Sequence, residues 1–363
     1  MSSADRFSGV DHTHMARALQ LAARGLYTTT PNPRVGCVIV KDGRVVGEGW
    51  HERAGTPHAE IHALKAAGEA ARGATVYVTL EPCSHHGRTP PCAEALVNAG
   101  VARVVAAMSD PNPLVAGGGI AMLTLAGIEA EVGLLEAEAR ALNPGFVSRM
   151  TRGRPWVRLK TASTLDGKTA LANGASQWIT GEAARADVQA LRARACAILT
   201  GSGTVLADNP RMNVRDLDIG RQPLRVVVDS ALRTPADAAI LPALVACHHA
   251  APAARAALEQ AGAEVVELPG ADGRVDLAAL LALLAQRGVN ELHVEAGAAL
   301  NGALLAAGWI DEWVAYVAPM AVGDDARALF ARPALTSLND AARFSLSDVR
   351  QIGSDLRLTL LPA

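Results

Sequence analysis

The 363-residue chain has few aromatic side chains and almost no net charge. Aromatic residues make up 3% of the sequence, and 34 basic against 36 acidic residues leave a formal net charge of −2. Few aromatic side chains leave few platforms on which bases could stack. A balanced charge also lacks the basic surplus that nucleic-acid-binding proteins usually show. We therefore expect no nucleic-acid partner.

Long apolar runs are also missing. No segment reaches the length of a membrane span, and the first fourteen residues, MSSADRFSGVDHTH, contain no apolar core of signal-peptide length. Five cysteines, an odd number in a long chain, do not form a disulfide framework. Cys37, Cys196 and Cys247 lie in apolar predicted strands and are expected to be small buried side chains. Together these absences predict a cytoplasmic protein without a membrane partner.

The sequence contains two series of alternating strands and helices. Half of the residues are apolar, and the length suggests two domains. The first series includes a hairpin that turns at Asp42-Gly43. A polar stretch at 149–155 is the expected linker, so we place the domains at 1–148 and 149–363. The second series has predicted strands at 157–162, 197–200, 224–228, 264–268, 291–295 and 312–317, and predicted helices at 182–193, 252–261, 277–287 and 298–307. This α/β order implies a largely parallel sheet covered on both faces.

Residues 58–92 contain a histidine and two cysteines in an arrangement that a packed core does not need. One imidazole and two thiolates, His58, Cys83 and Cys92, suit zinc, and three protein ligands leave a fourth position for water. His58 and Cys92 each follow a proline at a predicted helix start, and the partial positive charge of a helix N-terminus favours a thiolate. The pattern predicts one zinc ion in the N-terminal domain.

Glu60, two residues after His58, can face the open coordination position. Zinc lowers the pKa of bound water to about 7, and a nearby carboxylate can take that proton and return it to the substrate. The zinc nucleobase deaminases carry H-x-E followed by P-C-x-x-C. Here HAE and Pro82-Cys83 match, whereas eight residues instead of two separate the cysteines. We predict that Glu60 is the proton shuttle.

Three other interpretations stay open at this stage. A closed zinc site that only holds loops together would need a fourth ligand, such as His62, His85 or His86. A base deaminase acting on tRNA or DNA would use the same first-domain motif, although the near-neutral charge disfavours it. A deaminase could also be fused to a non-catalytic ligand-binding or assembly domain.

Further motifs resemble the bifunctional deaminase–reductase family of riboflavin biosynthesis. The N-terminal half carries TTTPNPRVGCVIV, PHAEIHAL, TLEPCSHHGRTPPC and DPNPLVAGGGIAMLTLAGI, and the C-terminal half carries VRLKTASTLDGKTA, SQWITG, DVQALRA, AILTGSGTVLADNP and VEAGAALNGALL. The resemblance covers residues 11–320, and the long insertion between the cysteines is part of it. It implies a cytidine-deaminase-like zinc domain followed by a dihydrofolate-reductase-like domain.

The resemblance implies two successive reactions. The first is zinc-hydroxide deamination of 2,5-diamino-6-ribosylamino-4(3H)-pyrimidinone 5′-phosphate. The second is reduction of the ribosyl side chain to ribityl with NADPH, which gives 5-amino-6-(5-phosphoribitylamino)uracil. The expected partners are one Zn²⁺ per deaminase domain, NADPH and the phosphorylated pyrimidine. We also expect a homo-oligomer.

The resemblance further suggests which residues contact the ligands. Asn32 is an implied substrate contact, or it only supports its Pro-Asn-Pro turn. His51 and His85 could reach the substrate or its phosphate, or be structural. In the second domain, the implied cofactor contacts are Ala162, Trp178, Thr204, Asp208 and Gly297, and the implied substrate contacts are Ser176, Arg192, Arg215 and Glu295. Arginine forks suit a phosphate, and the backbone amides after Gly297 would start a helix that favours an anion. The alternative for Arg192 is that it is a solvent-exposed charge on its helix and contacts no ligand.

The reduction step also needs a proton donor. A ring-opened imine of the sugar accepts hydride at C1′ once its nitrogen is protonated. Lys160 and Glu295 end two predicted strands, where open α/β sheets place their sites. We predict that these two residues supply or relay the proton, and that Asp166 shapes the adjacent turn.

Overall fold

The computed structural model describes residues 6–85, 90–113 and 115–363, and the chain divides into two compact units, Met1–Gly153 and Arg154–Ala363. The division between Gly153 and Arg154 falls within the expected linker at 149–155, although helix α6 (Pro144–Arg152) runs through residues 149–152 of that stretch. Pro144 occupies the first turn of this helix, and Gly153 ends it in the left-handed region at φ +66°. Proline at a helix start and glycine after its end are the usual signals.

The N-terminal unit is a five-stranded sheet with the order β2-β1-β3-β4-β5. Its strands are β1 (Gly36–Lys41), β2 (Arg44–Trp50), β3 (Thr75–Val78), β4 (Arg103–Ala106) and β5 (Glu129–Val132). β1 is antiparallel to β2 and β3, whereas β3, β4 and β5 are parallel. Asp42 (φ +50°) and Gly43 (φ +72°) form the predicted hairpin turn, because both positions tolerate a positive φ.

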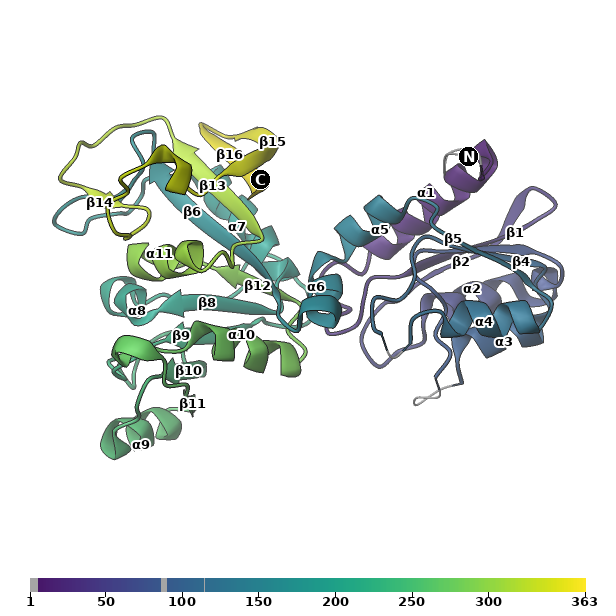
Figure 1. The fold of residues 1–363 in the computed structure, drawn as a ribbon, viewed down its shortest axis with the longest axis horizontal. Helices are drawn as coiled ribbons and strands as arrows, with labels where there is room; N and C mark the ends of the chain where they lie inside the picture. Colours follow the sequence, from purple (N-terminus) through teal and green to yellow (C-terminus); the bar gives the residue numbers. More distant parts are fainter. Residues whose placement is uncertain (1–5, 86–89, 114) are drawn as a thin grey trace. The chain divides into compact units, whose positions relative to one another are not determined.

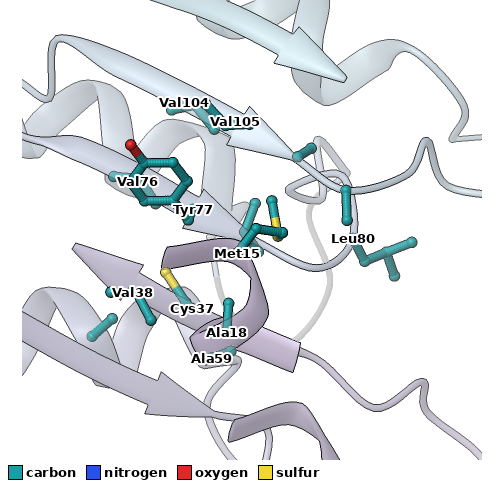
Figure 2. Close-up of a cluster of buried hydrophobic side chains, with 14 of the residues drawn as sticks. Met15, Ala18, Cys37, Val38, Ala59, Val76, Tyr77, Leu80, Val104 and Val105 are labelled. Atoms are coloured by element: carbon teal, nitrogen blue, oxygen red, sulfur yellow. The ribbon is translucent and has the colours of Figure 1, made fainter. Parts of the chain in front are cut away.

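Helices cover both faces of this sheet (Figure 1). α1 (Gly9–Ala23) and α5 (Glu136–Leu142) lie on one face, and α2 (Ala59–Ala67), α3 (Cys92–Ala99) and α4 (Gly118–Leu125) lie on the other. A 3₁₀ turn (Gly68–Ala71) follows α2. Figure 2 shows the core, in which Met15 and Ala18 of α1 lie near Cys37 of β1. Cys37 is fully buried there, as the sequence predicted.

The C-terminal unit is a nine-stranded sheet with the order β11-β10-β9-β8-β12-β6-β13-β16-β15. Its strands are β6 (Trp156–Thr164), β8 (Ala197–Gly201), β9 (Leu224–Val228), β10 (Leu244–Cys247), β11 (Glu264–Glu267), β12 (Glu291–Val294), β13 (Glu312–Ala318), β15 (Phe344–Ile352) and β16 (Asp355–Pro362). Seven strands are parallel, and the hairpin of β16 and β15 continues the sheet antiparallel to β13. A small ribbon pairs β7 (Lys168–Ala170) with β14 (Arg327–Ala328).

Helices also cover both faces of the second sheet. α10 (Leu277–Gln286) and α11 (Ala298–Ala306) pack on one face, and their leucines share a core with the inward residues of β6, β8 and β12. α7 (Glu182–Arg194), α8 (Ser202–Asp208) and α9 (Pro252–Gln260) contribute to the apolar clusters of the opposite face. Two 3₁₀ turns, Ala271–Gly273 and Leu338–Asp340, lie in connecting segments. Within the described ranges, no helix is both long and apolar enough to cross a bilayer.

Candidate active sites

Three side chains meet beside two helix N-termini of the first unit. His58 is the N-cap of α2, Cys92 is the first residue of α3, and Cys83 lies in the loop after β3. Their ligand atoms all lie within 4.8 Å of one another. His58 Nδ1 is 3.3 Å from Cys92 Sγ and 3.7 Å from Cys83 Sγ. Tetrahedral zinc, with bonds of about 2.0 Å to nitrogen and 2.3 Å to sulfur, separates such atoms by about 3.5 Å. The three residues therefore fit zinc.

The surroundings of the two sulfur atoms favour a cation. The backbone N–H of Cys92 donates to Cys83 Sγ over 3.3 Å, as expected for a thiolate at a helix N-terminus. Hydrogen bonding from the Cys92 side chain lowers the pKa of Cys83 to about 4, and His58 acts in the same direction against the effect of burial. The same contact, together with burial, raises the pKa of Cys92. Without a cation the two sulfur atoms therefore share one proton, which stays on Cys92, and a bound zinc ion would supply the positive charge that allows both to be thiolates.

Glu60 lies in the first turn of α2 and is only 3% exposed. Burial raises the pKa of Glu60, although the charge of His58 acts in the opposite direction. Its carboxyl group also contacts the Cys92 side chain. A buried carboxyl beside a metal triad, with a pKa moved toward neutrality, suits a group that accepts and returns protons.

Asn32 and His51 form a connected pair next to this triad. The Asn32 side-chain amide lies 3.1 Å from His51 Nε2, and His51 Nδ1 lies 3.1 Å from the carbonyl oxygen of Pro57. Because that carbonyl can only accept, His51 carries its proton on Nδ1 and accepts from Asn32 on Nε2. Burial lowers the pKa of His51, which keeps the ring neutral. The ring stands edge-on to His58, with centroids 5.5 Å apart, so the predicted contacts Asn32 and His51 do lie at the site.

Two of the three candidates for a fourth zinc ligand, His62 and His85, do not join the triad. In the described ranges, the metal-ligand group contains neither His62 nor His85. His85 is exposed, and His62 Nε2 is buried without a hydrogen-bond partner in the described part of the chain. His86 lies outside the described residues. The geometry supports a site with three protein ligands.

Sequence reasoning missed Glu81, which precedes Pro82-Cys83. Its buried carboxylate accepts four backbone N–H groups at 3.0–3.3 Å, those of Asp110, Gly117, Gly119 and Ile120. These bonds tie the cysteine loop to the start of α4. Gly119 is needed there, because a Cβ at this position would lie 1.9 Å from the Pro82 carbonyl oxygen. An acidic residue directly before the ligand motif was the available signal.

The second unit contains a large cavity of about 1120 Å³. Every site residue predicted for this domain lines it: Lys160, Ala162, Ser176, Trp178, Arg192, Thr204, Asp208, Arg215, Glu295 and Gly297. Eight basic and two acidic side chains border the cavity, so it suits ligands with several phosphates. Gly297 lines the cavity as the N-cap of α11, and the first backbone amides of such a helix favour an anion. The sequence did not predict the further basic residues Arg185, Arg211, Arg233, Arg274 and Arg327.

Glu295 is the centre of a charge network in this cavity. Arg192 donates two hydrogen bonds to its carboxylate, from Nε to Oε1 at 2.5 Å and from Nη2 to Oε2 at 3.0 Å. Lys160 Nζ lies 3.7 Å from Oε2. Burial alone raises the pKa of Glu295, but the charges of Arg192 and Lys160 outweigh it and hold this pKa well below its usual value. Glu295 is therefore a carboxylate at neutral pH. Arg192 is no solvated helix charge, since it is 9% exposed and already paired.

Two family models match the chain. The cytidine and deoxycytidylate deaminase zinc-binding region matches residues 8–108, and the RibD C-terminal domain matches residues 155–358. The folds, the zinc-compatible triad and the basic cavity agree with these matches. Together they define a two-domain enzyme with a deaminase half and a reductase half.

Similar proteins of known name extend over both halves. The riboflavin biosynthesis protein RibD of Escherichia coli is 50% identical over 97% of this chain and 100% of its own length. The RibD protein of Haemophilus influenzae is 48% identical over 98% of both chains. The solved Acinetobacter baumannii RibD has 49% identity and a TM-score of 0.91 over 98% of this chain and 99% of that one. A Thermotoga maritima structure, described as a diaminohydroxyphosphoribosylaminopyrimidine deaminase/5-amino-6-(5-phosphoribosylamino)uracil reductase, has 33% identity and a TM-score of 0.85 over the same shares.

The chain therefore belongs to the RibD family and is a bifunctional deaminase and reductase of riboflavin biosynthesis. The predicted resemblance and the predicted fold class are confirmed. The alternatives of a nucleic-acid deaminase and of a non-catalytic second domain are rejected.

Proposed function

We propose that the chain deaminates 2,5-diamino-6-ribosylamino-4(3H)-pyrimidinone 5′-phosphate and then reduces the ribosyl side chain of the product with NADPH. One observation carries this proposal: a single chain holds a zinc-compatible triad beside a buried carboxyl group and, in its other unit, a cavity with eight basic side chains. The first arrangement suits hydrolytic removal of an amino group. The second suits a phosphorylated substrate together with a cofactor that carries three phosphates.

In the deaminase half, His58, Cys83 and Cys92 would hold zinc. When bound, zinc supplies a Lewis acid that lowers the pKa of water. Glu60 would accept the first proton of the attacking water and deliver it to the ring nitrogen of the pyrimidine. It would then take the second proton from the hydroxyl group added to the ring carbon and pass it to the leaving amine, which departs as ammonia while the carbonyl forms. The raised pKa of Glu60 allows its carboxyl group to hold the proton between these transfers. Asn32, fixed by its bond to His51, orients the ring.

In the reductase half, NADPH supplies the hydride, and Ala162, Trp178, Thr204, Asp208 and Gly297 would border it. Of the two residues predicted for this role, Lys160 is the better proton donor. The positive charges of Arg192 and Lys160 keep Glu295 ionised, so its carboxylate has no proton to donate. Glu295 forms an ion pair with Lys160, 3.7 Å from Oε2 to Nζ, and so holds the ammonium group at the cavity wall. This network supports a division of roles in which Lys160 donates the proton and Glu295 orients it.

In this proposal Arg215, and not Arg192 alone, binds the substrate phosphate. Arg192 uses one face of its guanidinium on Glu295 and donates with Nη1 to the Asn213 carbonyl oxygen. Arg215 is exposed at the cavity wall, and its backbone N–H is held by the Gln189 side chain. Ser176 lines the same cavity. A guanidinium group without a carboxylate partner binds a phosphate dianion more strongly than one whose charge a carboxylate already neutralises.

We also propose a homo-oligomer that works in the cytoplasm. The hairpin of β15 and β16 forms the edge of the second sheet and exposes Leu346, Val349, Leu356 and Leu361. An exposed apolar edge strand favours pairing with another chain. None of the five cysteines forms a disulfide, which is the usual state in a reducing compartment. Light scattering should give a mass above one chain, and a Leu346→Lys, Val349→Lys variant should shift it toward the monomer.

Product analysis by mass spectrometry tests the two reactions directly. The purified chain should convert the diamino substrate to a deaminated product without NADPH. Adding NADPH should yield the ribityl product with matching NADPH oxidation. NADPH oxidation that does not depend on the deaminated intermediate would contradict the proposed order.

A further inference from the structure

A polar stripe crosses the otherwise apolar face of the reductase sheet that α7 covers. Side chains alternate along a strand, so Glu291, His293 and Glu295 share one face, whereas Leu292 and Val294 enter the apolar core on the other. Arg192 and Arg194 of α7 reach down to this stripe and bond to Glu295 and Glu291. Burying so many polar groups costs free energy of folding unless each is hydrogen-bonded or paired with an opposite charge.

His293 lies in the middle of this stripe and is fully buried. Its Nε2 is 3.1 Å from Glu295 Oε1, and its Nδ1 has no hydrogen-bond partner in the described part of the chain. A carboxylate oxygen can only accept, so the imidazole carries its proton on Nε2 and donates it to Glu295. Nδ1 is then a bare acceptor. His293 is therefore a neutral imidazole that donates one hydrogen bond, to Glu295.

The two oxygens of the Glu295 carboxylate have different partners. Oε1 receives Arg192 Nε at 2.5 Å and His293 Nε2 at 3.1 Å. Oε2 receives Arg192 Nη2 at 3.0 Å and has Lys160 at 3.7 Å. Lys160, Arg192 and Glu295 line the cavity, whereas His293 does not. The imidazole thus holds the carboxylate from inside the sheet and leaves Oε2 for Lys160.

We propose that His293 is a positioning residue for the reduction step and acts only through Glu295. By occupying Oε1, it keeps the carboxylate from pivoting and fixes the lysine ammonium group at the place where the sugar nitrogen must be protonated. This inference rests on the proposed roles of Glu295 and Lys160. A catalytic group held by neighbours loses rate when its support is removed, even if nothing in contact with the substrate changes.

Two variants of the full chain separate positioning from packing. His293→Leu keeps an apolar side chain of similar size without a donor, and His293→Gln restores an N–H near the position of Nε2. For reduction of the deaminated substrate, His293→Leu should lower kcat by about 10- to 100-fold, the factor expected for losing a bond to a charged group. The KM for NADPH should change by less than about 3-fold. His293→Gln should recover most of the lost kcat.

Two measurements check that the variants fold. Deamination by the other domain of the same chain should stay at the wild-type rate, and NADPH binding followed by fluorescence should keep its Kd. If His293→Leu weakens NADPH binding as much as it lowers kcat, or if His293→Gln is as slow as His293→Leu, the residue supports the fold and the proposal is wrong.

A double-mutant cycle with Glu295→Gln separates this inference from the function on which it rests. If His293 acts through Glu295, His293→Leu should cost less than about 2-fold once Glu295 is already glutamine. An equal loss in both backgrounds overturns the positioning role alone. If Glu295→Gln by itself reduces the substrate at the wild-type rate, the proposed role of Glu295 fails, and the role of His293 fails with it.

Discussion

The two active sites of this chain are built in different ways. The deaminase site gathers His58, Cys83 and Cys92 within 4.8 Å at two helix N-termini. The reductase site spreads around a cavity of about 1120 Å³, and its predicted residues extend from Lys160 to Gly297 along the chain. A metal demands particular atoms at fixed distances. A cofactor and a phosphorylated sugar are bound by many weaker contacts, so the loss of one contact should cost less.

The largest expected effect comes from removing a metal ligand. Cys92→Ser replaces a soft thiolate with a hydroxyl, which binds zinc poorly. Zinc content, measured by mass spectrometry of the metal, should fall below about 0.1 per chain, and deamination should drop by at least about 1000-fold. Reduction of pre-deaminated substrate should continue at the wild-type rate. Full zinc occupancy in this variant would reject the assignment of Cys92 as a ligand.

Glu60→Gln is the next largest change in the same site. The amide keeps the size of the side chain but cannot take up a proton, so deamination should fall by at least about 100-fold, the usual scale for a general acid–base group. Zinc content should remain near that of the wild type, which distinguishes this variant from Cys92→Ser. Near-normal deamination in Glu60→Gln would mean that another group moves the proton.

The contrast between the sites also explains what the sequence could predict. His58, Glu60 and the cysteines lie within 35 residues and follow a spacing set by chemistry, so their meeting was predictable from the residues alone. Lys160 and Glu295 were predictable only as strand ends, because β6 and β12 bring them together across the sheet. The fork from Arg192 to Glu295 was not predictable, since it depends on how α7 packs on that sheet.

The fold shows the same division between local and tertiary information. The strand at 224–228 has the predicted bounds, and α3 begins at Cys92 as predicted, because apolar patterning and Pro90-Pro91 define these positions locally. β10 contains Cys247, for which the sequence predicted an apolar strand, but four apolar residues carry no clear period from which its bounds could be predicted. β15 was missed because it is exposed over most of its length and owes its pairing to β16. Residues 149–152 of the predicted linker are helical, because their arginines belong to the last turn of α6.

A smaller effect separates the two arginines of the reductase site. Arg215→Ala should weaken binding of the phosphorylated substrate by about 10- to 100-fold, the value of a charge-assisted fork. The dephosphorylated substrate should bind equally weakly to the variant and to the wild type. Arg192→Ala should instead lower kcat more than it raises KM, because it unpairs Glu295. If Arg192→Ala weakens only the phosphorylated substrate, Arg192 binds the phosphate after all.

The smallest expected effect concerns stability and lies away from both sites. Asp11, 5% exposed, accepts hydrogen bonds from Arg103 and Tyr77, each at 2.7 Å. Burial alone raises the pKa of Asp11, but the bonds from Arg103, Tyr77 and Ser8 outweigh it and hold this pKa far below its usual value. A carboxyl with a depressed pKa in the folded state stabilises the fold above its unfolded pKa of about 3.9, and the stabilisation is lost as the pH falls toward the folded pKa.

Asp11→Asn should therefore destabilise the N-terminal unit at pH 7 by about 1.5–3 kcal/mol, the value of a hydrogen bond to a charged group. In urea unfolding, the free energy of unfolding of the variant should lie below that of the wild type by a constant amount between pH 7 and 5. This difference in free energy should narrow as the pH falls below about 4. Glu48→Gln is the matched control, because the exposed Arg17–Glu48 pair should contribute less than about 1 kcal/mol. Reductase activity should be unchanged in both variants. A difference that widens on acidification would show that Asp11 is not ionised in the folded chain, and that the network linking α1 to β3 and β4 is held by packing instead of charge.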